Sequence, residues 1–386
     1  MILKSLTICL LFTASSVLAR LDLSHLLSGK VPLDARNMDS LYNHFTNEYR
    51  NPQLSAYLAR KDQGRNVDRR AIFESNVKDM VAHNSKSDKL WEMGINEYSH
   101  MTYEEFVSYF NIVKKDQICT VAPPSTEKKT MKDLKGTVPA SWDWRQFGIV
   151  TPVKNQGSCG SCWTFSTVGV MESHYLLKYG GKARYFSEQQ LVDCAGAFDT
   201  YGCSGGLPSH SYEYIMYNGG LTTEDQYPYK GVNQTCQYKN GMQSISVVGG
   251  SINITTDEVA IAQALFENGP TSISFTVMPD FKMYKGGIYS NSTCPNGPLD
   301  VNHDVVLVGY GTENGTDYWI IKNSWGTTFG ENGYFRMQRG VNMCGIKNCG
   351  SYPQSVVDVQ QAVPKESPRE AYKATFLKNK EQELTQ

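Results

Sequence analysis

The sequence carries no excess of charge of either sign. Its 386 residues include 37 Lys and Arg against 38 Asp and Glu, a formal net charge of −1 with histidine neutral. A protein that binds nucleic acid needs a basic excess to neutralise phosphates, so this balance argues against that class. Charged residues make up only 19% of the chain, beside 33 Gly, 23 Tyr and 15 Phe. The composition argues against a disordered chain and indicates a folded, turn-rich protein, long enough for two ordinary domains.

Long apolar runs are also missing beyond residue 19. No run there approaches the ~20 apolar residues that a transmembrane helix requires, so we expect no membrane span. Residues 1–19 differ, because Lys4 precedes an apolar stretch that ends at Val17-Leu18-Ala19, with small residues where signal peptidase cuts. We therefore expect a secretory signal peptide and an oxidising compartment in which cysteines pair. Four Asn-x-Ser/Thr glycosylation sequons fit a secreted chain, at Asn233, Asn253, Asn291 and Asn314.

The chain divides at an aperiodic segment, residues 114–136, which contains Pro123-Pro124 and a charge run. We expect an exposed linker there, a place where proteases cut. Upstream, residues 20 to about 110 are polar and predict helices. Positions spaced by three and four place six residues on one helix face: Arg69, Ile72, Phe73, Asn76, Met80 and Asn84.

Downstream of Val138 the sequence predicts a mixed α+β domain. A helix is expected over 162–179, where an apolar stripe stops at Gly180-Gly181. Short β-branched runs predict strands over 244–248, 271–277, 304–310 and 318–322. After Pro353 the chain is polar again, and we expect 354–386 to be a solvated extension.

The strongest local signal for chemistry is the run from Gln156 to Trp163, QGSCGSCW. Cys162 begins the predicted helix, and the positive end of the helix dipole favours a thiolate there. A thiolate is a nucleophile, but a cysteine enzyme also needs a base. Cys159 and Cys162 together also form a C-x-x-C, which leaves a thiol–disulfide oxidoreductase as an alternative from another class. A zinc site at this pair is weaker, because no second pair of ligands follows at a suitable spacing.

Only three of the seven histidines follow the linker, since His25, His44, His83 and His100 precede it. His174 lies twelve residues into the helix that Cys162 begins, more than ~15 Å away along the axis. His210 lies in a turn region and is expected to be a surface residue. His303 begins a predicted strand, where a rigid element can hold an imidazole, and we favour it as the base. Asn323, near the large aromatic Trp325, can orient the second ring nitrogen of that base.

Taken together, residues 138–353 resemble a papain-family, cathepsin-type cysteine protease. His303 follows Cys162 at a separation inside the family's range, and Asn323 follows at one slightly beyond it. Further motifs of the same family are Ser187-Glu188-Gln189, Gly202-Cys203-Ser204-Gly205-Gly206 and Val308-Gly309-Tyr310-Gly311. The resemblance implies a two-lobed α+β fold, with a helical left lobe, a β-barrel-like right lobe and a cleft between them.

The resemblance also assigns roles. It implies that Cys162 is the nucleophile, His303 its imidazolium partner, and Asn323 the residue that fixes the His303 tautomer. The side-chain amide of Gln156 would donate a hydrogen bond to the oxyanion that forms when the thiolate attacks the substrate carbonyl. The substrate-binding residues would be Gly205, Gly206, Asp304 and Trp325. The implied reaction is peptide-bond hydrolysis through a Cys162 thioester, with no metal and no organic cofactor. Asp304 departs from the family, which usually has Ala or Gly there, and we expect either a preference for a cationic group or a side chain turned away.

The N-terminal part resembles the family's helical inhibitory propeptide. Arg69, Phe73, Asn76 and Asn84 match its helical signature, and residues 94–100 match its second motif, with His100 in place of the usual Asp. The resemblance implies a zymogen whose propeptide fills the cleft in reverse and is removed at low pH. The expected organisation is a signal peptide (1–19), propeptide and linker (20–137), protease domain (138–353) and C-terminal extension (354–386).

Eight cysteines remain once Cys9 leaves with the signal peptide and Cys162 is set aside, and eight allow 105 pairings. The family pattern selects Cys159–Cys203, Cys194–Cys236 and Cys294–Cys344. Cys119 and Cys349 remain, and we hypothesise that they pair, as in cathepsin H, where a tethered propeptide remnant confers aminopeptidase activity. We expect an endopeptidase, with that cathepsin H-like aminopeptidase as the alternative. The resemblance further implies peptide or protein substrates, cystatin-type inhibitors as partners, a monomer, and a lysosomal, vacuolar or extracellular location.

Overall fold

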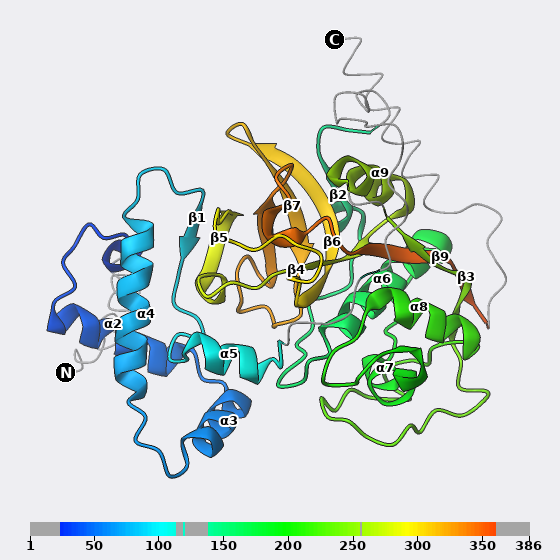
Figure 1. Cartoon of the computed structure of the whole chain (residues 1–386), viewed down its shortest axis with the longest axis horizontal. Coiled ribbons are helices and arrows are strands. Elements are labelled where there is room, and N and C mark those ends of the chain that lie inside the picture. The colour runs from blue at the N-terminus through cyan, green and yellow to red at the C-terminus, as the bar shows by residue number, and fades with distance from the viewer. Residues whose placement is uncertain (1–23, 113–118, 120–137, 255–256, 360–386) are drawn as a thin grey trace, which may run out of the picture. The chain divides into compact units, whose positions relative to one another are not determined.

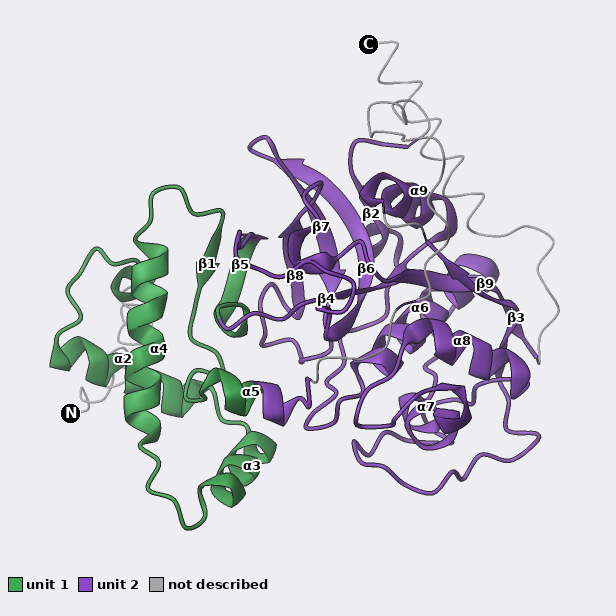
Figure 2. Cartoon of the chain, viewed as in Figure 1, with its two compact units in different colours: residues 1–106, 280–287 green, residues 107–279, 288–386 purple. Residues whose placement is uncertain are grey.

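The computed structural model describes residues 24–112, 119, 138–254 and 257–359 (Figure 1). They form two compact units (Figure 2). The first unit consists of the chain up to Phe106 together with Asp280–Gly287, and the second of Val107–Pro279 and the chain from Ile288 onward. The expected signal peptide, the linker apart from Cys119, and the expected extension beyond residue 359 lie outside the described residues.

The first unit is mainly helical. Its helices are α2 (Ala35–Glu48), α3 (Pro52–Asp62), α4 (Arg69–Asn84) and the beginning of α5 (Tyr103–Tyr109). The first three begin where an Asp or Asn side chain accepts a hydrogen bond from the first turn: Asp34, Asn51 and Asp68. Helix α4 confirms the helix predicted by the three-and-four spacing from Arg69 to Asn84.

Residues between Met93 and Met101 stabilise this unit through hydrogen bonds to α4. The Asn84 amide donates to Met93 O (2.9 Å) and its oxygen accepts from Met93 N (2.9 Å). Met93 ends strand β1 (Trp91–Met93), which pairs antiparallel with Tyr284–Gly287. The Asn76 amide donates to Ser99 O and Met101 O. Asn76 and Asn84, two polar residues of the predicted helix face, therefore hold residues 93–101 against α4.

The second unit contains helices and one open sheet. Its helices are α6 (Cys162–Tyr179), α7 (Glu188–Cys194), α8 (Pro208–Tyr217) and α9 (Glu258–Asn268), with short 3-10 turns at Trp144–Phe147, Ala195–Phe198 and Met343–Gly345. Its strands are β2 (Trp142–Asp143), β3 (Ile245–Asn253), β4 (Thr271–Phe275), the end of β5 (Tyr284–Tyr289), β6 (His303–Glu313), β7 (Thr316–Lys322), β8 (Tyr334–Gln338) and β9 (Gly350–Asp358). Helix α6 and all four predicted strands are confirmed, although β3 ends at Asn253 rather than at residue 248 and β6 at Glu313 rather than at residue 310.

The strand order in this unit is β5-β8-β7-β6-β4-β9-β3, and β2 pairs with β6. Within the described residues no pairing joins β3 back to β5, so the sheet stays open rather than closing as the β-barrel-like lobe that the resemblance implies. A second correction concerns the domain end. Strand β9 continues to Asp358, which pairs with Ile245, so the folded domain extends past Pro353. The buried residues Val356 and Asp358 alternate with more exposed ones, as expected for a strand with one covered face.

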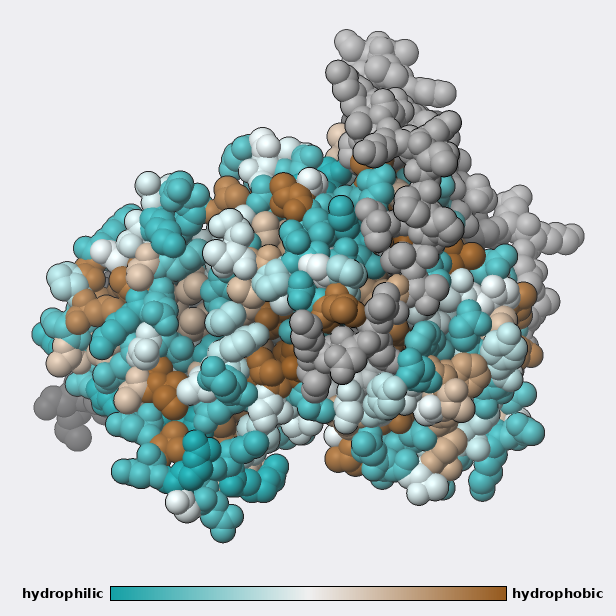
Figure 3. Space-filling view, viewed as in Figure 1, coloured by the Kyte–Doolittle hydropathy of each residue, from teal (hydrophilic) through white to brown (hydrophobic). Residues whose placement is uncertain are grey.

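Helix α6 forms the centre of the second unit, because Cys162 and the next fifteen residues are all buried. It packs against β6, and Ser166 Oγ donates to Val305 O (2.8 Å) across that contact. On the face drawn in Figure 3, hydrophobic residues form small patches among hydrophilic ones. The buried side chains of α6 therefore belong to the core of the unit, and the first turns of this helix contact the beginning of β6.

Candidate active site

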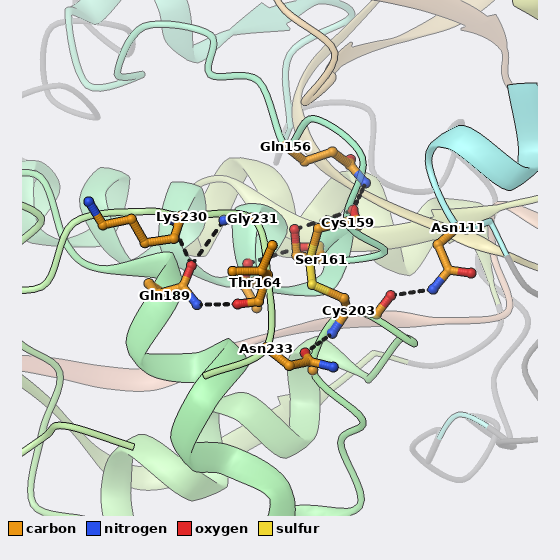
Figure 4. Close-up of a disulfide and its surroundings, with 12 residues drawn as sticks. Asn111, Gln156, Cys159, Ser161, Thr164, Gln189, Cys203, Lys230, Gly231 and Asn233 are labelled. Atoms are coloured by element: carbon orange, nitrogen blue, oxygen red, sulfur yellow. Dashed lines mark hydrogen bonds between the residues drawn. A yellow bond between two sulfur atoms is a disulfide. The ribbon is translucent and has the colours of Figure 1, made fainter. Parts of the chain in front are cut away.

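Cys162 is the first residue of α6, and it is the described cysteine that stands outside the disulfides. The loop before it is fixed by Gln156, whose side chain is fully buried. The Gln156 amide donates to Cys159 O at 2.9 Å (Figure 4). Its oxygen accepts from Ser324 Oγ at 2.6 Å. Gln156 therefore ties the loop that carries the thiol to the segment that follows β7.

The Cys159–Cys203 disulfide holds the same loop from the other side (Figure 4). Gly160 N donates to Cys203 O (2.9 Å), and a Cβ on Gly160 would lie 2.4 Å from that oxygen. Only glycine permits this approach. Cys203 N donates to Asn233 Oδ1 (2.8 Å), so the partner loop is fixed as well.

His303 and Asn323 meet at neighbouring strand ends. His303 begins β6, and Asn323 follows the last residue of β7, which pairs antiparallel with β6. His303 Nε2 lies 2.8 Å from Asn323 Oδ1, and the same oxygen accepts from Ser324 N at 2.8 Å. The backbone donor identifies this atom as the amide oxygen, so Nε2 must donate to it. Nδ1 is then the nitrogen of the neutral ring that can take up a proton.

Trp325 covers this hydrogen bond. Its ring is fully buried and stacks on the His303 ring, with a centroid distance of 4.7 Å. The Phe110 ring also stacks on Trp325, with a centroid distance of 4.9 Å, and the Asn111 amide donates to Cys203 O. Phe110 and Asn111 therefore contact Trp325 and the loop that contains Cys203.

Asp304, the second residue of β6, lies next to the Cys162 thiol. Its side chain is fully buried, and its Oδ2 lies 3.8 Å from Cys162 Sγ. Its Oδ1 accepts a hydrogen bond from Ser274 Oγ on β4. The structure thus brings Cys162 to the residue next to His303, and it turns Asp304 toward the thiol rather than away from it.

The two glycines assigned to substrate binding lie in the loop after the disulfide. Gly205 has a φ of 109°, a conformation that favours glycine. A Cβ on Gly206 would lie 2.7 Å from the Trp163 ring, so this backbone passes directly over the second residue of α6. The other histidines lie elsewhere: His174 Nε2 contacts Pro270 O (2.9 Å), and His210 contacts Asp199.

A cluster of buried and half-buried charges, which the sequence did not predict, lies next to the site. Lys154 Nζ lies 2.7 Å from both Glu172 Oε1 and Glu188 Oε1. Burial lowers the pKa of Lys154, but the two carboxylates outweigh this effect and raise it above its ordinary value. Burial lowers the pKa of Lys322 to about 8. These residues line a cavity of about 20 Å³ that also reaches Asp304. Glu188 belongs to the Ser187-Glu188-Gln189 motif, but the other members stand as isolated charged residues, which in a sequence indicate solvated surface.

The disulfides in the structure coincide with the predicted set. They are Cys119–Cys349, Cys159–Cys203, Cys194–Cys236 and Cys294–Cys344. Because Cys159 pairs with Cys203, it cannot exchange with Cys162 in the manner of a C-x-x-C oxidoreductase. Nor can it supply a thiolate to a zinc ion with Cys162. The four bonds are consistent with folding in the secretory pathway.

Comparison with known proteins identifies the family of this chain. Residues 138–354 match the model of the papain family of cysteine proteases, more than half of the chain. This chain belongs to the papain family. Residues 42–106 match the cathepsin propeptide inhibitor domain (I29), so the papain-family protease is made as a proenzyme with its own inhibitor. Within the described residues, no helix is both long and apolar enough to cross a membrane.

Relatives of this papain-family chain include cathepsin H-type enzymes. "Cysteine proteinase 3" of Solanum lycopersicum is 48% identical over 73% of this chain and 77% of its own length. "Pro-cathepsin H" of Mus musculus is 45% identical over 73% of this chain and 83% of its own. Among solved structures, digestive procathepsin L2 proteinase from the Tenebrio molitor larval midgut has a TM-score of 0.68 and 34% identity, covering 83% of this chain and 99% of its own.

Proposed function

We propose that the mature protein hydrolyses peptide bonds by acyl transfer to Cys162. The hydrogen bond of 2.8 Å between His303 Nε2 and Asn323 Oδ1 carries this proposal, because it leaves Nδ1 as the basic nitrogen. His303 takes the thiol proton, and the thiolate attacks the substrate carbonyl carbon. The imidazolium then protonates the leaving amine, and a thioester remains. Water, deprotonated by His303, attacks the thioester and releases the acid and the thiol.

The tetrahedral intermediate needs donors for its oxyanion. We assign this role to the backbone N–H of Cys162 and to the Gln156 amide. The first N–H groups of a helix have no acceptor within the helix, so that of Cys162 can serve an oxyanion. One N–H of the Gln156 amide donates to Cys159 O, and its second N–H can donate to the oxyanion. One such donor is worth about 3–4 kcal/mol of transition-state stabilisation.

Gly205 and Gly206 are assigned to the substrate backbone, which can approach closely where no side chain projects. Trp325 shields the His303–Asn323 hydrogen bond from water. The segment Phe110–Ile112 occupies this region in the proenzyme, since Phe110 stacks on Trp325. Removal of the propeptide would open the site, and we propose that acid drives this step.

A second candidate, aminopeptidase activity, is supported by the Cys119–Cys349 disulfide. Cys119 is buried with Leu207, Val301 and Cys349, and it lines a cavity of only about 10 Å³ that also includes Ser274. Ser274 bonds to Asp304, the neighbour of the thiol. A remnant tethered here would block long substrates on the acyl side and leave room for an N-terminal residue. Relatives named pro-cathepsin H support the same candidate.

The test uses acid-activated full-length protein and fluorogenic amides, either free at the amino end or N-acetylated. The wild type should hydrolyse at least one of the two substrates, and Cys162→Ala should hydrolyse neither. If the tether matters, Cys119→Ser/Cys349→Ser should gain activity on acetylated peptides and lose its preference for free amines. Failure of active-site alkylation to abolish hydrolysis would contradict the role of Cys162.

The remaining proposals concern the processing, location, inhibition and glycosylation of this protease. We propose removal of residues 1–19 and delivery to a lysosome or vacuole or to the extracellular space, as a monomer sensitive to cystatin-type inhibitors. Among the sequons, Asn314 is exposed in the turn between β6 and β7 and is the best glycan acceptor. A mass shift of the secreted protein on deglycosylation, absent in Asn314→Gln, tests that site.

A further inference from the structure

The hydroxyl of Tyr229 lies between the two segments that carry the assigned oxyanion donors. Its oxygen is 2.7 Å from the backbone oxygen of Gln156 and 2.6 Å from the hydroxyl oxygen of Ser161, the residue before Cys162. Tyr229 has no part in the chemistry described above. Because it contacts both segments, this one hydroxyl can fix the separation between them.

The directions of the two hydrogen bonds follow from the chemistry of the groups. A backbone carbonyl only accepts, so the single phenolic hydrogen of Tyr229 is donated to Gln156 O. The Tyr229 oxygen is then the acceptor of the second bond, and Ser161 Oγ is its donor. Burial raises the pKa of the Tyr229 phenol above its ordinary value, which keeps the hydroxyl protonated. A chain of two hydrogen bonds therefore runs from Ser161 through Tyr229 to Gln156.

Ser161 is the N-cap residue of α6, yet its side chain makes no capping hydrogen bond. A serine at this position ordinarily accepts from the N–H of the second or third helical residue. Here Thr164 N donates instead to the backbone oxygen of Ser161, at 2.8 Å. A capping hydroxyl would lie among the first N–H groups of the helix, where we expect the oxyanion to bind. The bond to Tyr229 therefore keeps the Ser161 hydroxyl from competing with the oxyanion for these donors.

The other end of the chain of hydrogen bonds, Gln156, is held at each of its polar atoms. Its backbone N–H donates to Ser324 O at 2.9 Å, and its side-chain oxygen accepts from Ser324 Oγ. Its side-chain amide donates to Cys159 O, and its backbone oxygen accepts from Tyr229. Ser324 thus fixes Gln156 to the segment after β7, whereas Tyr229 fixes it to the residue that precedes α6.

Tyr229 is itself held by both its ring and its backbone. The ring packs edge-on against Phe165 of α6, with a centroid distance of 4.9 Å. The Tyr229 N–H donates to Glu224 Oε1 at 2.8 Å, and the N–H of the next residue, Lys230, donates to Gln189 Oε1 at 2.8 Å (Figure 4). A group held in this way can position its partners closely. Such precision matters because a misplacement of about 1 Å can slow a reaction roughly 100-fold.

We propose that Tyr229 is a positioning residue that sets the separation of the two oxyanion donors, the Gln156 amide and the backbone N–H of Cys162. The proposal deepens the proposed peptidase function and rests on it. In this role Tyr229 acts through Gln156 and Ser161 and does not contact the substrate. Loss of its hydroxyl should therefore slow the chemical step and leave substrate binding and the thiol unchanged.

The test compares Tyr229→Phe with the wild type in acid-activated protein, on a fluorogenic amide that the wild type hydrolyses. This variant keeps the ring against Phe165 and removes only the hydroxyl. It should lower kcat about 10- to 100-fold and leave KM within about twofold, because a displaced donor stabilises the transition state less. Alkylation of Cys162 by iodoacetamide forms no oxyanion, so its rate should not fall. Tyr217→Phe, which removes a hydroxyl from an exposed ring, should match the wild type.

A double-mutant cycle shows whether Tyr229 acts through the Gln156 side chain. Gln156→Ala keeps the backbone oxygen but lacks the amide, so in this background Tyr229→Phe should lower kcat by less than about threefold. Ser161→Ala removes one of the two hydrogen bonds of the tyrosine and should lower kcat by about three- to tenfold, again without slowing alkylation. If Tyr229→Phe does not fold, Ser161→Ala decides by the same two rates.

The outcomes separate this proposal from the peptidase function. If the wild type hydrolyses no amide and Cys162 does not label with iodoacetamide, the peptidase function has failed and the positioning role fails with it. If the wild type hydrolyses the amide and both Tyr229→Phe and Ser161→Ala retain its kcat, the peptidase function stands and the positioning role is wrong. Equal losses in hydrolysis and alkylation, or an undiminished loss in the Gln156→Ala background, also contradict that role, because they indicate general support of the loop.

Discussion

At the scale of single residues, the site depends on hydrogen bonds that are buried away from water. Asn323 Oδ1 accepts from both His303 Nε2 and Ser324 N, and Trp325 stacks over the histidine ring. In such surroundings a hydrogen bond is electrostatically stronger than in water. The pair therefore holds one tautomer and one ring orientation before substrate arrives.

The assignment of Gln156 gives a prediction at this scale. Gln156→Ala should lower kcat about 100- to 1,000-fold, because the oxyanion loses a donor. Alkylation of Cys162 by iodoacetamide creates no oxyanion on a tetrahedral carbon, so its rate should change little. Ser158→Ala, an exposed change in the same loop, is the matched control. Equal losses in hydrolysis and alkylation would instead indicate that Gln156 only supports the loop.

The same residues show what a sequence can and cannot predict. Cys162, His303 and Asn323 could be selected because nucleophile, base and orienter each demand a particular side chain next to a helix start or strand end. Lys154 and Glu172 could not, because their burial depends on packing between segments distant in the sequence. Asp304 could be recognised as unusual, but its orientation toward the thiol required the register of β4 and β6.

At the scale of elements, we expect His100 to make the stability of the first unit depend on pH. Its ring lies 4.8 Å from that of Phe45 on α2, and its backbone carbonyl accepts from Arg69 of α4. Its Nδ1 is buried without a hydrogen-bond partner among the described residues. Burial, followed by the charge of Arg69, lowers the pKa of His100 to about 4. Glu105, Asp62 and Lys282 also face the ring, the two carboxylates opposing the shift and the lysine adding to it.

The sign of the pH dependence follows from this shift. The folded pKa of about 4 lies below the unfolded value of about 6.5, so the unfolded chain binds more protons between them. Stability of the first unit should be full above pH 6.5 and should fall as the pH drops toward 4, by ~3 kcal/mol or less. We predict that His100→Gln flattens this part of the stability curve.

The measurement is limited proteolysis of the first unit against pH, in full-length protein carrying Cys162→Ala to prevent autolysis. His25→Gln, an exposed histidine in the same unit, serves as control and should behave as the wild type. If wild type and His100→Gln lose resistance at the same pH, His100 does not sense acid. The family motif has Asp at this position, so only the burial seen in the structure indicates how His100 can respond.

At the scale of the whole molecule, buried charges and disulfides join distant segments. Lys154, which precedes α6, bonds to Glu172 on α6 and to Glu188 on α7. Lys154→Met should destabilise the second unit by about 3–5 kcal/mol, because two buried carboxylates lose their cation. Chemical denaturation of the Cys162→Ala protein measures this loss. Lys182→Met, an exposed change, should cost little, and an equal cost would contradict the account.

Large-scale organisation was only partly accessible from the sequence. The helical and strand-rich parts follow from periodicity, but eight cysteines leave 105 pairings, and only the family pattern selected among them. The open sheet and the continuation of β9 to Asp358 depend on long-range pairing between β3 and β9. A polar composition after Pro353 concealed that pairing, because one face of this edge of the sheet is solvated.

The most direct test of the account is the pH dependence of Cys162 alkylation in the activated enzyme. If His303 and Cys162 form an imidazolium–thiolate pair, iodoacetamide should label Cys162 rapidly well below the ordinary thiol pKa of about 8.5. In His303→Ala the labelling should move to near that value, and in Asn323→Ala it should shift partway. Identical labelling profiles in wild type and His303→Ala would contradict the proposed pair and, with it, the assigned mechanism.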